Sequence, residues 1–278
     1  MKDYQDTLLE LAAECYADPV RFAEIAFDWG HGDLIDFDGL DTWQRDFLEE
    51  LGRDIVDAEA NDKPVRKATA SGHGIGKSAL VAIIILWYMT TRPRARIRVT
   101  ANTEKQLLGT TWPELALWHK RSIFKDWFLW EATRFSKIGD RENWFAEAIS
   151  WNENNPDAFA GLHGRYVMLI MDEASGVADS IWETALGVLT DAGNTHLAFG
   201  NPIRPSGGFY DCFYHPKKSK RWKTRHINAL ETKIGNSQSN REIFEDYGPE
   251  HDVTRRRVLG QFPRQAASQF ISTADVEG

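Results

Sequence analysis

The segment SGHGIGKS, residues 71–78, holds the residues of this chain with the clearest capacity for chemistry. It matches the phosphate-binding loop pattern G-x-x-x-x-G-K-[ST] at every fixed position except the first, where serine replaces glycine. In such a loop the backbone N–H groups wrap the phosphates, and glycine allows the dihedral angles and close approach that this requires. The residues expected to surround the phosphates of a nucleotide are Ser71, Gly72, His73, Gly74, Ile75, Gly76, Lys77 and Ser78.

Two side chains of this loop have expected roles of their own. Lys77 would meet the β- and γ-phosphates, and the Ser78 hydroxyl would bind Mg²⁺. The apolar run at 79–89 predicts a buried helix whose dipole presents positive potential to the phosphates. The alternative is a glycine-rich turn before a core helix, but a strand on one side and a helix on the other favour the phosphate site.

A pair of acids, Asp172 and Glu173, follows the apolar run YVMLIM at 166–171. At the carboxyl end of a buried strand, Asp172 would hold Mg²⁺ through its water shell and Glu173 would polarise the attacking water. Surface acids that merely end a core strand are the alternative. The presence of a pair, with the glycine loop upstream, favours hydrolysis.

The alternation of extended and helical segments predicts the fold class. The expected strands are 65–70, 94–101, 144–151, 166–171 and 195–200, and the expected helices are 79–89, a segment capped by Thr103, and 178–189. Strands that alternate with helices indicate an α/β fold with a mainly parallel sheet flanked by helices.

Composition and charge narrow the function classes. The net charge of −8 argues against a protein that coats nucleic acid non-specifically. The basic segment HPKKSKRWKTRH at 215–226 suits contact with phosphates, with a solvated loop as the equally weighted alternative. The segment TRPRARIR at 91–98 is expected to be a strand with an exposed positive face. The run at 79–89 is too short to span a bilayer, so we expect no membrane association.

Taken together, SGHGIGKS, LIMDEAS and THLAFGNPIRPSGGFYD resemble the large terminase subunit of tailed bacteriophages, the ATPase motor that packages DNA into capsids. The resemblance runs from about Trp43 to the end of the chain. It implies a P-loop NTPase core of the ASCE, RecA-like kind that uses ATP and Mg²⁺ and drives double-stranded DNA into a procapsid. It also implies the viral portal and the small terminase subunit as partners, a homo-oligomeric ring when assembled, and the host cytoplasm as location.

Two alternatives come from other function classes. One is a helicase-like, nucleic-acid-dependent ATPase that is not linked to capsids. The other is a nucleotide-gated binding module without turnover, against which the acid pair at 172–173 argues.

The resemblance assigns further site residues. In DTWQRDFL, Trp43 would stack near the adenine base and Gln44 would read its hydrogen-bonding edge, while Asp41 or Thr42 can also cap a helix there. In FGNP, Asn201 would belong to the motif that senses the γ-phosphate and transmits hydrolysis to movement. The family offers an arginine finger before the acidic strand; Arg165 is the nearest arginine here, and His163 occupies an equally plausible position.

The resemblance also suggests a domain organisation. We expect an N-terminal helical lead-in at 1–40, the P-loop ATPase core at 41–224, and a small helical linker subdomain at 225–278. Large terminases continue into an RNase H-like nuclease, and this chain stops at QFISTADVEG, about where that domain would begin. We therefore expect it to be the motor portion alone.

Overall fold

The computed structural model describes residues 4–151, 161–189 and 191–264 of the chain. Its α-helices are α1 (Tyr4–Glu14), α2 (Pro19–Ala26), α3 (Thr42–Ala60), α4 (Lys77–Thr91), α5 (Glu104–Gln106), α6 (Trp112–Arg121), α7 (Asp179–Leu186), α8 (Gly208–Tyr214), α9 (Gln238–Tyr247) and α10 (Asp252–Arg257). Its strands are β1 (Val65–Ser71), β2 (Arg96–Thr100), β3 (Phe128–Trp130), β4 (Arg134–Lys137), β5 (Phe145–Ala148), β6 (Val167–Met171), β7 (Thr195–Gly200) and β8 (Lys223–Ile227).

All of these strands belong to one sheet, in the order β3-β4-β5-β2-β6-β7-β1-β8. The six neighbouring strands β5, β2, β6, β7, β1 and β8 pair in parallel. The strands β4 and β3 are added antiparallel beside β5 and form one edge of the sheet. β7 lies between β1, which leads into the glycine loop, and β6, which leads into the acid pair. The mainly parallel sheet confirms the predicted α/β fold.

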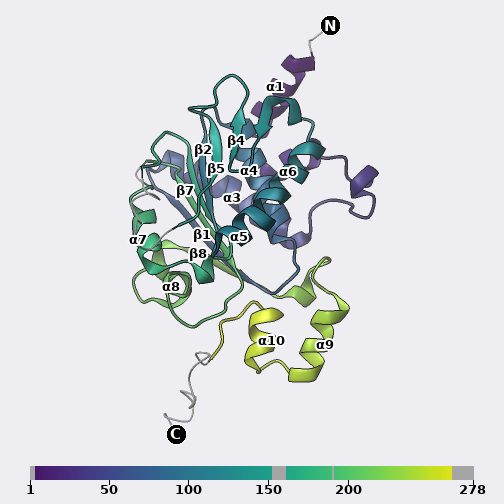
Figure 1. Cartoon of the computed structure of the whole chain (residues 1–278), viewed down its shortest axis with the longest axis vertical. Helices are drawn as coiled ribbons and strands as arrows, with labels where there is room; N and C mark the ends of the chain where they lie inside the picture. The colour runs from purple at the N-terminus through teal and green to yellow at the C-terminus, as the bar shows by residue number, and fades with distance from the viewer. Residues whose placement is uncertain (1–3, 152–160, 190, 265–278) are drawn as a thin grey trace.

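The sheet is buried on both faces, as Figure 1 shows, with α4 and α6 on one side and α7 and α8 on the other. Alternate side chains of β6 divide between these layers. Ile170 joins the cluster that contains α3, α4 and α6, whereas Leu169 and Met171 join the cluster that contains α7 and α8. This two-sided burial explains why β6 reads as a continuous apolar run rather than an alternating one.

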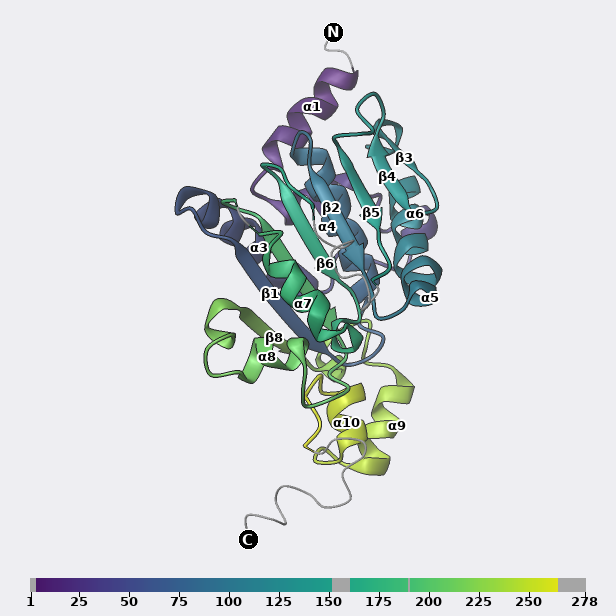
Figure 2. The same cartoon turned by 60° about the vertical axis from the view of Figure 1, so that its left-hand side comes forward.

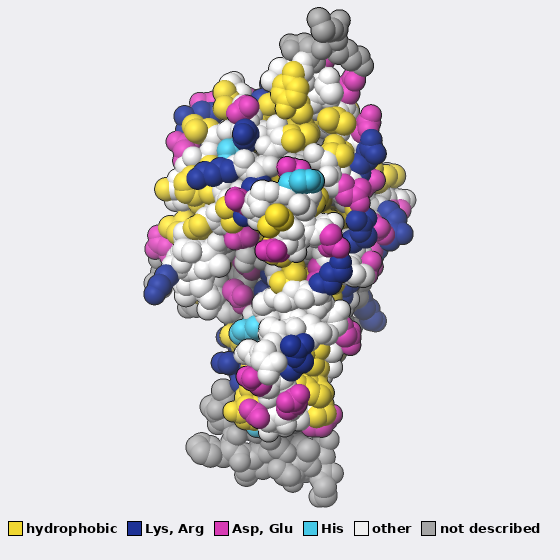
Figure 3. All heavy atoms as spheres, turned by 90° about the vertical axis from the view of Figure 1, so that its right-hand side faces the viewer, with side chains coloured by type: hydrophobic (Ala, Val, Ile, Leu, Met, Phe, Trp, Pro, Cys, Tyr) yellow, Lys and Arg dark blue, Asp and Glu magenta, His cyan; other side chains and the backbone are white. Residues whose placement is uncertain are grey.

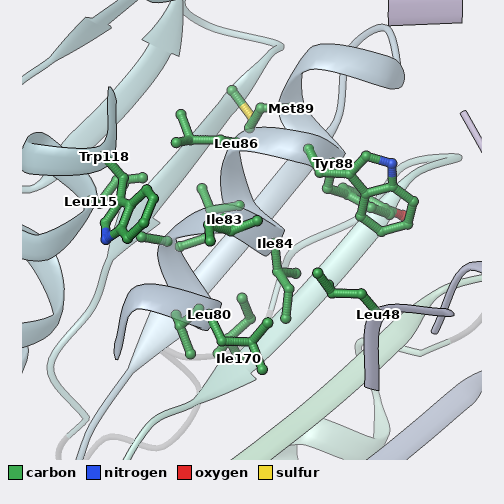
Figure 4. Packing of buried hydrophobic residues seen from close by; sticks show 14 of the residues in the cluster. Leu48, Leu80, Ile83, Ile84, Leu86, Tyr88, Met89, Leu115, Trp118 and Ile170 are labelled. Atoms are coloured by element: carbon green, nitrogen blue, oxygen red, sulfur yellow. The ribbon is translucent and has the colours of Figure 1, made fainter. Parts of the chain in front are cut away.

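The helix α4 is apolar around most of its circumference, so it is buried from Leu80 to Thr91. Figure 4 shows its side chains packed against α3, α6 and β6. The residues labelled there are Leu48, Leu80, Ile83, Ile84, Leu86, Tyr88, Met89, Leu115, Trp118 and Ile170. This packing fixes the start of α4, and with it the glycine loop, relative to the sheet.

The helices α9 and α10 lie together at one end of the molecule, and α1 lies at the other end (Figures 1 and 2). The strand β8 pairs in parallel with β1, so residue 225, the expected start of the linker subdomain, falls inside the sheet. The helical unit begins after Ile227. At the other end of the chain, Leu8 of α1 and Phe22 of α2 share one core cluster with α3 and α4, so the N-terminal helices pack directly on the helices that cover the sheet.

The prediction of an exposed positive face at 91–98 is wrong. Arg92 is fully buried, with the rings of Tyr16, Trp87 and Tyr88 within 4.6 Å of its guanidinium. Arg98 is also buried, and its Nη2 donates to Glu147 at 2.7 Å. The aromatic rings around Arg92 and the Glu147 carboxylate beside Arg98 make burial of these charges tolerable.

No helix among the described residues is both long enough and apolar enough to cross a membrane.

Candidate nucleotide-binding site

The predicted loop, the acid pair and Asn201 come together at one edge of the sheet. The glycine loop follows β1, Asp172 follows β6 and Asn201 follows β7, and these three strands are parallel and adjacent in the order β6-β7-β1. The carboxyl ends of parallel strands meet at the same edge, which is where open α/β sheets bind ligands.

The loop has the conformation that phosphate binding requires. Gly74 and Gly76 have φ angles of 70° and 80°, in the left-handed region that favours glycine. The N–H groups of residues 74–78 donate to no acceptor in the described chain. These donors lie at the start of a buried helix, where the helix dipole favours an anion, so the loop fits a phosphate group.

Lys77 is the charged centre of the site. Its Nζ donates to Asn201 Oδ1 at 3.3 Å and lies 4.0 Å from Glu173 Oε1. Asn201 Nδ2 in turn donates to the Ser71 carbonyl at 2.6 Å. The side chain predicted to sense the γ-phosphate therefore joins the first residue of the loop to the lysine that would meet that phosphate.

The Asp172 carboxylate is buried and oriented by two donors. The Thr111 hydroxyl donates to Oδ2 at 2.7 Å, and the Glu173 N–H donates to Oδ1 at 3.0 Å. Burial, followed by the charge of Glu173, raises the pKa of Asp172, so its ionised form would be stabilised by a nearby cation. Glu173 itself has φ 50°, an uncommon backbone conformation for a residue with a side chain, and its carboxylate is partly exposed beside Lys77.

The donor set fits Mg²⁺ held jointly by protein and nucleotide. Mg²⁺ prefers oxygen ligands and usually binds through one or two protein groups plus substrate phosphates and water. Asp172 and the hydroxyl of Ser78, in the first turn of α4, offer such oxygens. Among the residues that the structure describes, no group of three or more His, Cys, Asp or Glu side chains could hold a metal ion alone.

Trp43 and Gln44 lie at the site, but both contact the loop. Trp43 Nε1 donates to the Ile75 carbonyl at 3.1 Å, and Gln44 Nε2 donates to the Gly76 carbonyl at 3.0 Å. Gln44 Oε1 accepts the Asp41 N–H at 3.0 Å, as in a helix capping box. In this arrangement the two side chains hold the loop, and contact with adenine stays a prediction.

Arg165 is not brought to the site within one copy of the chain. Arg165 comes before β6, and Asp172 comes directly after that strand. The five residues of β6 span about 16 Å, so the two residues lie at opposite ends of the strand. His163 lies on the same side as Arg165, where both line an open cavity with Arg94 and Arg96. An arginine finger at 165 would therefore have to act on a neighbouring copy.

Thr111 and Asn240 are site residues that the sequence analysis missed. Thr111 ends a π-helical turn, Leu107–Thr111, that leads into α6. Asn240 is buried in α9, and its Nδ2 donates to the His73 carbonyl at 3.2 Å. A π-helical turn often marks a functional site, but no local residue pattern announces one.

A mainly parallel sheet with a phosphate-binding loop between β1 and α4 is the arrangement of a P-loop NTPase. No family model matches the chain. A curated protein described as "Probable terminase, large subunit" from Enterobacteria phage P7 is 28% identical over 96% of this chain, which spans 55% of that protein. The chain therefore covers about half the length of this curated relative.

Solved structures of large terminases share the fold. The large terminase of bacteriophage HK97 matches with a TM-score of 0.64 and 17% identity, over 93% of this chain and 57% of that one. The large terminase of the thermophilic bacteriophage D6E, in complex with ADP, matches with a TM-score of 0.53 and 15% identity, over 75% of this chain and 49% of that one. The resemblance to phage large terminase subunits that the motifs indicated is therefore confirmed in both sequence and fold.

Proposed function

We propose that this chain is the ATP-hydrolysing motor domain of a viral terminase, which drives translocation of double-stranded DNA into a procapsid. One observation carries the proposal: Lys77, Asn201 and Glu173 converge beside a loop whose N–H groups at 74–78 are free to bind phosphate. A site built only to bind a nucleotide would not need a partly exposed carboxylate beside the phosphate-binding lysine.

The chemistry follows from this arrangement. The loop N–H groups and Lys77 would hold the β- and γ-phosphates and stabilise the negative charge that develops on them. The Glu173 carboxylate would orient a water molecule and accept its proton as the water oxygen bonds to the γ-phosphorus. The bond from that phosphorus to the β–γ bridging oxygen breaks, and ADP and phosphate are the products.

Asp172 and Ser78 would hold Mg²⁺, which when bound neutralises charge on the β- and γ-phosphate oxygens. Thr111 keeps the Asp172 carboxylate oriented by its hydrogen bond to Oδ2. Asn201 would lose or weaken its bond to Lys77 when the γ-phosphate binds and regain it when the phosphate leaves, because both groups compete for the same ammonium. This is how hydrolysis could be transmitted to β7 and to the loop.

Double-stranded DNA is the proposed polymer substrate, and the segment 215–226 is the proposed contact. Three of its basic residues are already paired, because Lys218, Lys223 and Arg225 bind Asp211, Asp54 and Glu50. The exposed basic residues that remain there are Lys217, Lys220 and Arg221. On the face shown in Figure 3, basic and acidic side chains are intermixed, so this face offers no broad basic surface for DNA.

Assembly follows from the placement of Arg165. We infer a homo-oligomeric ring in which Arg165 of one copy reaches the nucleotide of the next, together with the viral portal and the small terminase subunit, in the host cytoplasm. Nothing in the comparisons favours the helicase-like alternative.

Steady-state phosphate release with and without DNA tests the proposal. We expect Mg²⁺-dependent ATPase activity that duplex DNA increases more than single-stranded DNA of equal length does. Absence of ATP hydrolysis would contradict the motor function, and stimulation by single strands alone would favour the helicase-like alternative.

A further inference from the structure

The end of α10 lies directly against the phosphate-binding loop. The His73 N–H donates to the Arg257 carbonyl at 2.7 Å, and the His73 carbonyl accepts from Asn240 of α9 at 3.2 Å. A Cβ atom at Gly72 would lie only 2.4 Å from the Val258 carbonyl oxygen, which shows how closely the two backbones approach. Both helices of the C-terminal unit are thus bonded to the beginning of the loop.

Three consecutive arginines end α10, and they differ in how their side chains are engaged. Arg255 Nε donates to the Phe262 carbonyl at 3.0 Å, and Arg256 Nε donates to the Asp252 carbonyl at 3.2 Å. The Arg257 side chain is exposed and makes no hydrogen bond or ion pair in the described chain. Arg257 is therefore available to a ligand.

The charge of Arg257 reaches the loop. Burial lowers the pKa of His73, and the positive charges of Lys77, Arg257 and Arg256 lower it further. The guanidinium of Arg257 thus shares its electrostatic environment with the lysine of the loop.

The beginning of the loop faces the part of the site where a terminal phosphate would lie. Asn201 bonds both the Ser71 carbonyl and Lys77 Nζ, which places Ser71, two residues before His73, near that ammonium and Glu173. The charge of Lys77 is partly balanced by Glu173, whereas a nucleoside triphosphate carries several negative charges. A second cation here would bind phosphate through charge-assisted hydrogen bonds, for which the planar guanidinium is well suited.

We propose that Arg257 contacts the terminal phosphate of a nucleoside triphosphate held in the loop of the same chain. The inference rests on the proposed function, because it adds a residue to the same nucleotide site. Arg257 would serve its own copy, whereas Arg165, at the opposite edge of the sheet, can only serve a neighbour.

Calorimetric titration of the chain with a slowly hydrolysed ATP analogue and with ADP, both with Mg²⁺, tests this. Arg257→Gln should weaken binding of the triphosphate about tenfold or more and binding of ADP less than about twofold, the loss of a charged hydrogen bond to the terminal phosphate. Arg257→Lys, which keeps the charge but not the fork of donors, should recover part of the triphosphate affinity. Arg256→Gln is the matched control on the same helical turn, and it should change both affinities less than about twofold.

Lys77→Ala, measured in parallel, separates the two proposals. If Lys77→Ala abolishes binding while Arg257→Gln binds the triphosphate as the unaltered chain does, the role of Arg257 is refuted and the nucleotide site stands. An equal loss for ADP and triphosphate, or the same loss in Arg256→Gln, also refutes it. If Lys77→Ala binds nucleotide normally, the proposed function itself fails.

Discussion

Replacing Gly72 by alanine should destabilise the chain because the new methyl group has no room. Its Cβ would lie 2.4 Å from the Val258 carbonyl oxygen and 2.8 Å from the Ala229 Cβ. The Val258 carbonyl cannot move away freely, since it accepts the Ala229 N–H at 2.7 Å. Forcing extra atoms into such a contact costs about 1–3 kcal/mol, and losing the neighbouring bond from His73 to Arg257 adds about 1 kcal/mol. We therefore expect the free energy of unfolding to fall by roughly 2–4 kcal/mol in Gly72→Ala.

Thermal unfolding followed by circular dichroism measures this change. In a chain of this size, the expected loss lowers Tm by about 5–10 °C. Gly109→Ala is the control, because a Cβ at Gly109 meets nothing within 4 Å and its φ is not positive. That variant should match the unaltered chain or exceed its stability slightly, since alanine favours helix more than glycine does. Equal Tm values for Gly72→Ala and Gly109→Ala would refute the close approach of α10 to the loop.

The remaining predictions concern the nucleotide and the metal. Lys77→Ala should abolish tight ATP binding in calorimetric titration, because it removes the charge held over the β- and γ-phosphates, whereas Lys105→Ala on the exposed side of α5 should bind normally. Unchanged affinity in Lys77→Ala would exclude the loop as the phosphate site. Thr111→Val removes the hydrogen bond to the buried Asp172 carboxylate, so it should raise the Mg²⁺ concentration for half-maximal ATPase about tenfold or more, because a hydrogen bond to a charged group contributes about 1.5–3 kcal/mol. An unchanged Mg²⁺ dependence would mean that Thr111 does not orient the metal ligand.

The phosphate-binding loop and most strands could be predicted from the sequence because their signals are local. The glycine spacing requires left-handed backbone angles at Gly74 and Gly76, and the structure has them. The strand predicted at 65–70 and the buried run at 166–171 appear as β1 and β6, within one residue at each end. Apolar runs between turn signals carry this information without knowledge of partners.

The segment after Thr103 shows where local periodicity stops being sufficient. Thr103 does cap a helix, since its hydroxyl accepts the Gln106 N–H at 3.1 Å. The predicted single helix is instead interrupted by the π-helical turn at 107–111, which ends at the residue that bonds Asp172, 61 positions along the chain. Helical spacing alone gives no sign of such an interruption.

Side chains whose partners come from distant segments could not be assigned from sequence. Gln44 donates to the Gly76 carbonyl, 32 residues along the chain, and its expected contact with adenine stays a prediction. Arg92 was expected on a solvent face, but the ring of Tyr16, from the turn between α1 and α2, covers it. In both cases the side chain's chemistry was clear and its partner was not, because the partner is decided by packing.

The measurement that tests the central claim most directly is ATP hydrolysis by Glu173→Gln, with ATP affinity determined on the same preparation. The amide keeps the shape of the side chain but cannot accept a proton from water, so we expect ATP binding to persist and phosphate release to fall by about a hundredfold or more. Glu183→Gln, an exposed position on α7, is the matched control and should hydrolyse ATP at the unaltered rate. Hydrolysis at the unaltered rate in Glu173→Gln would contradict the account, because the carboxylate beside Lys77 would then not be the group that activates water.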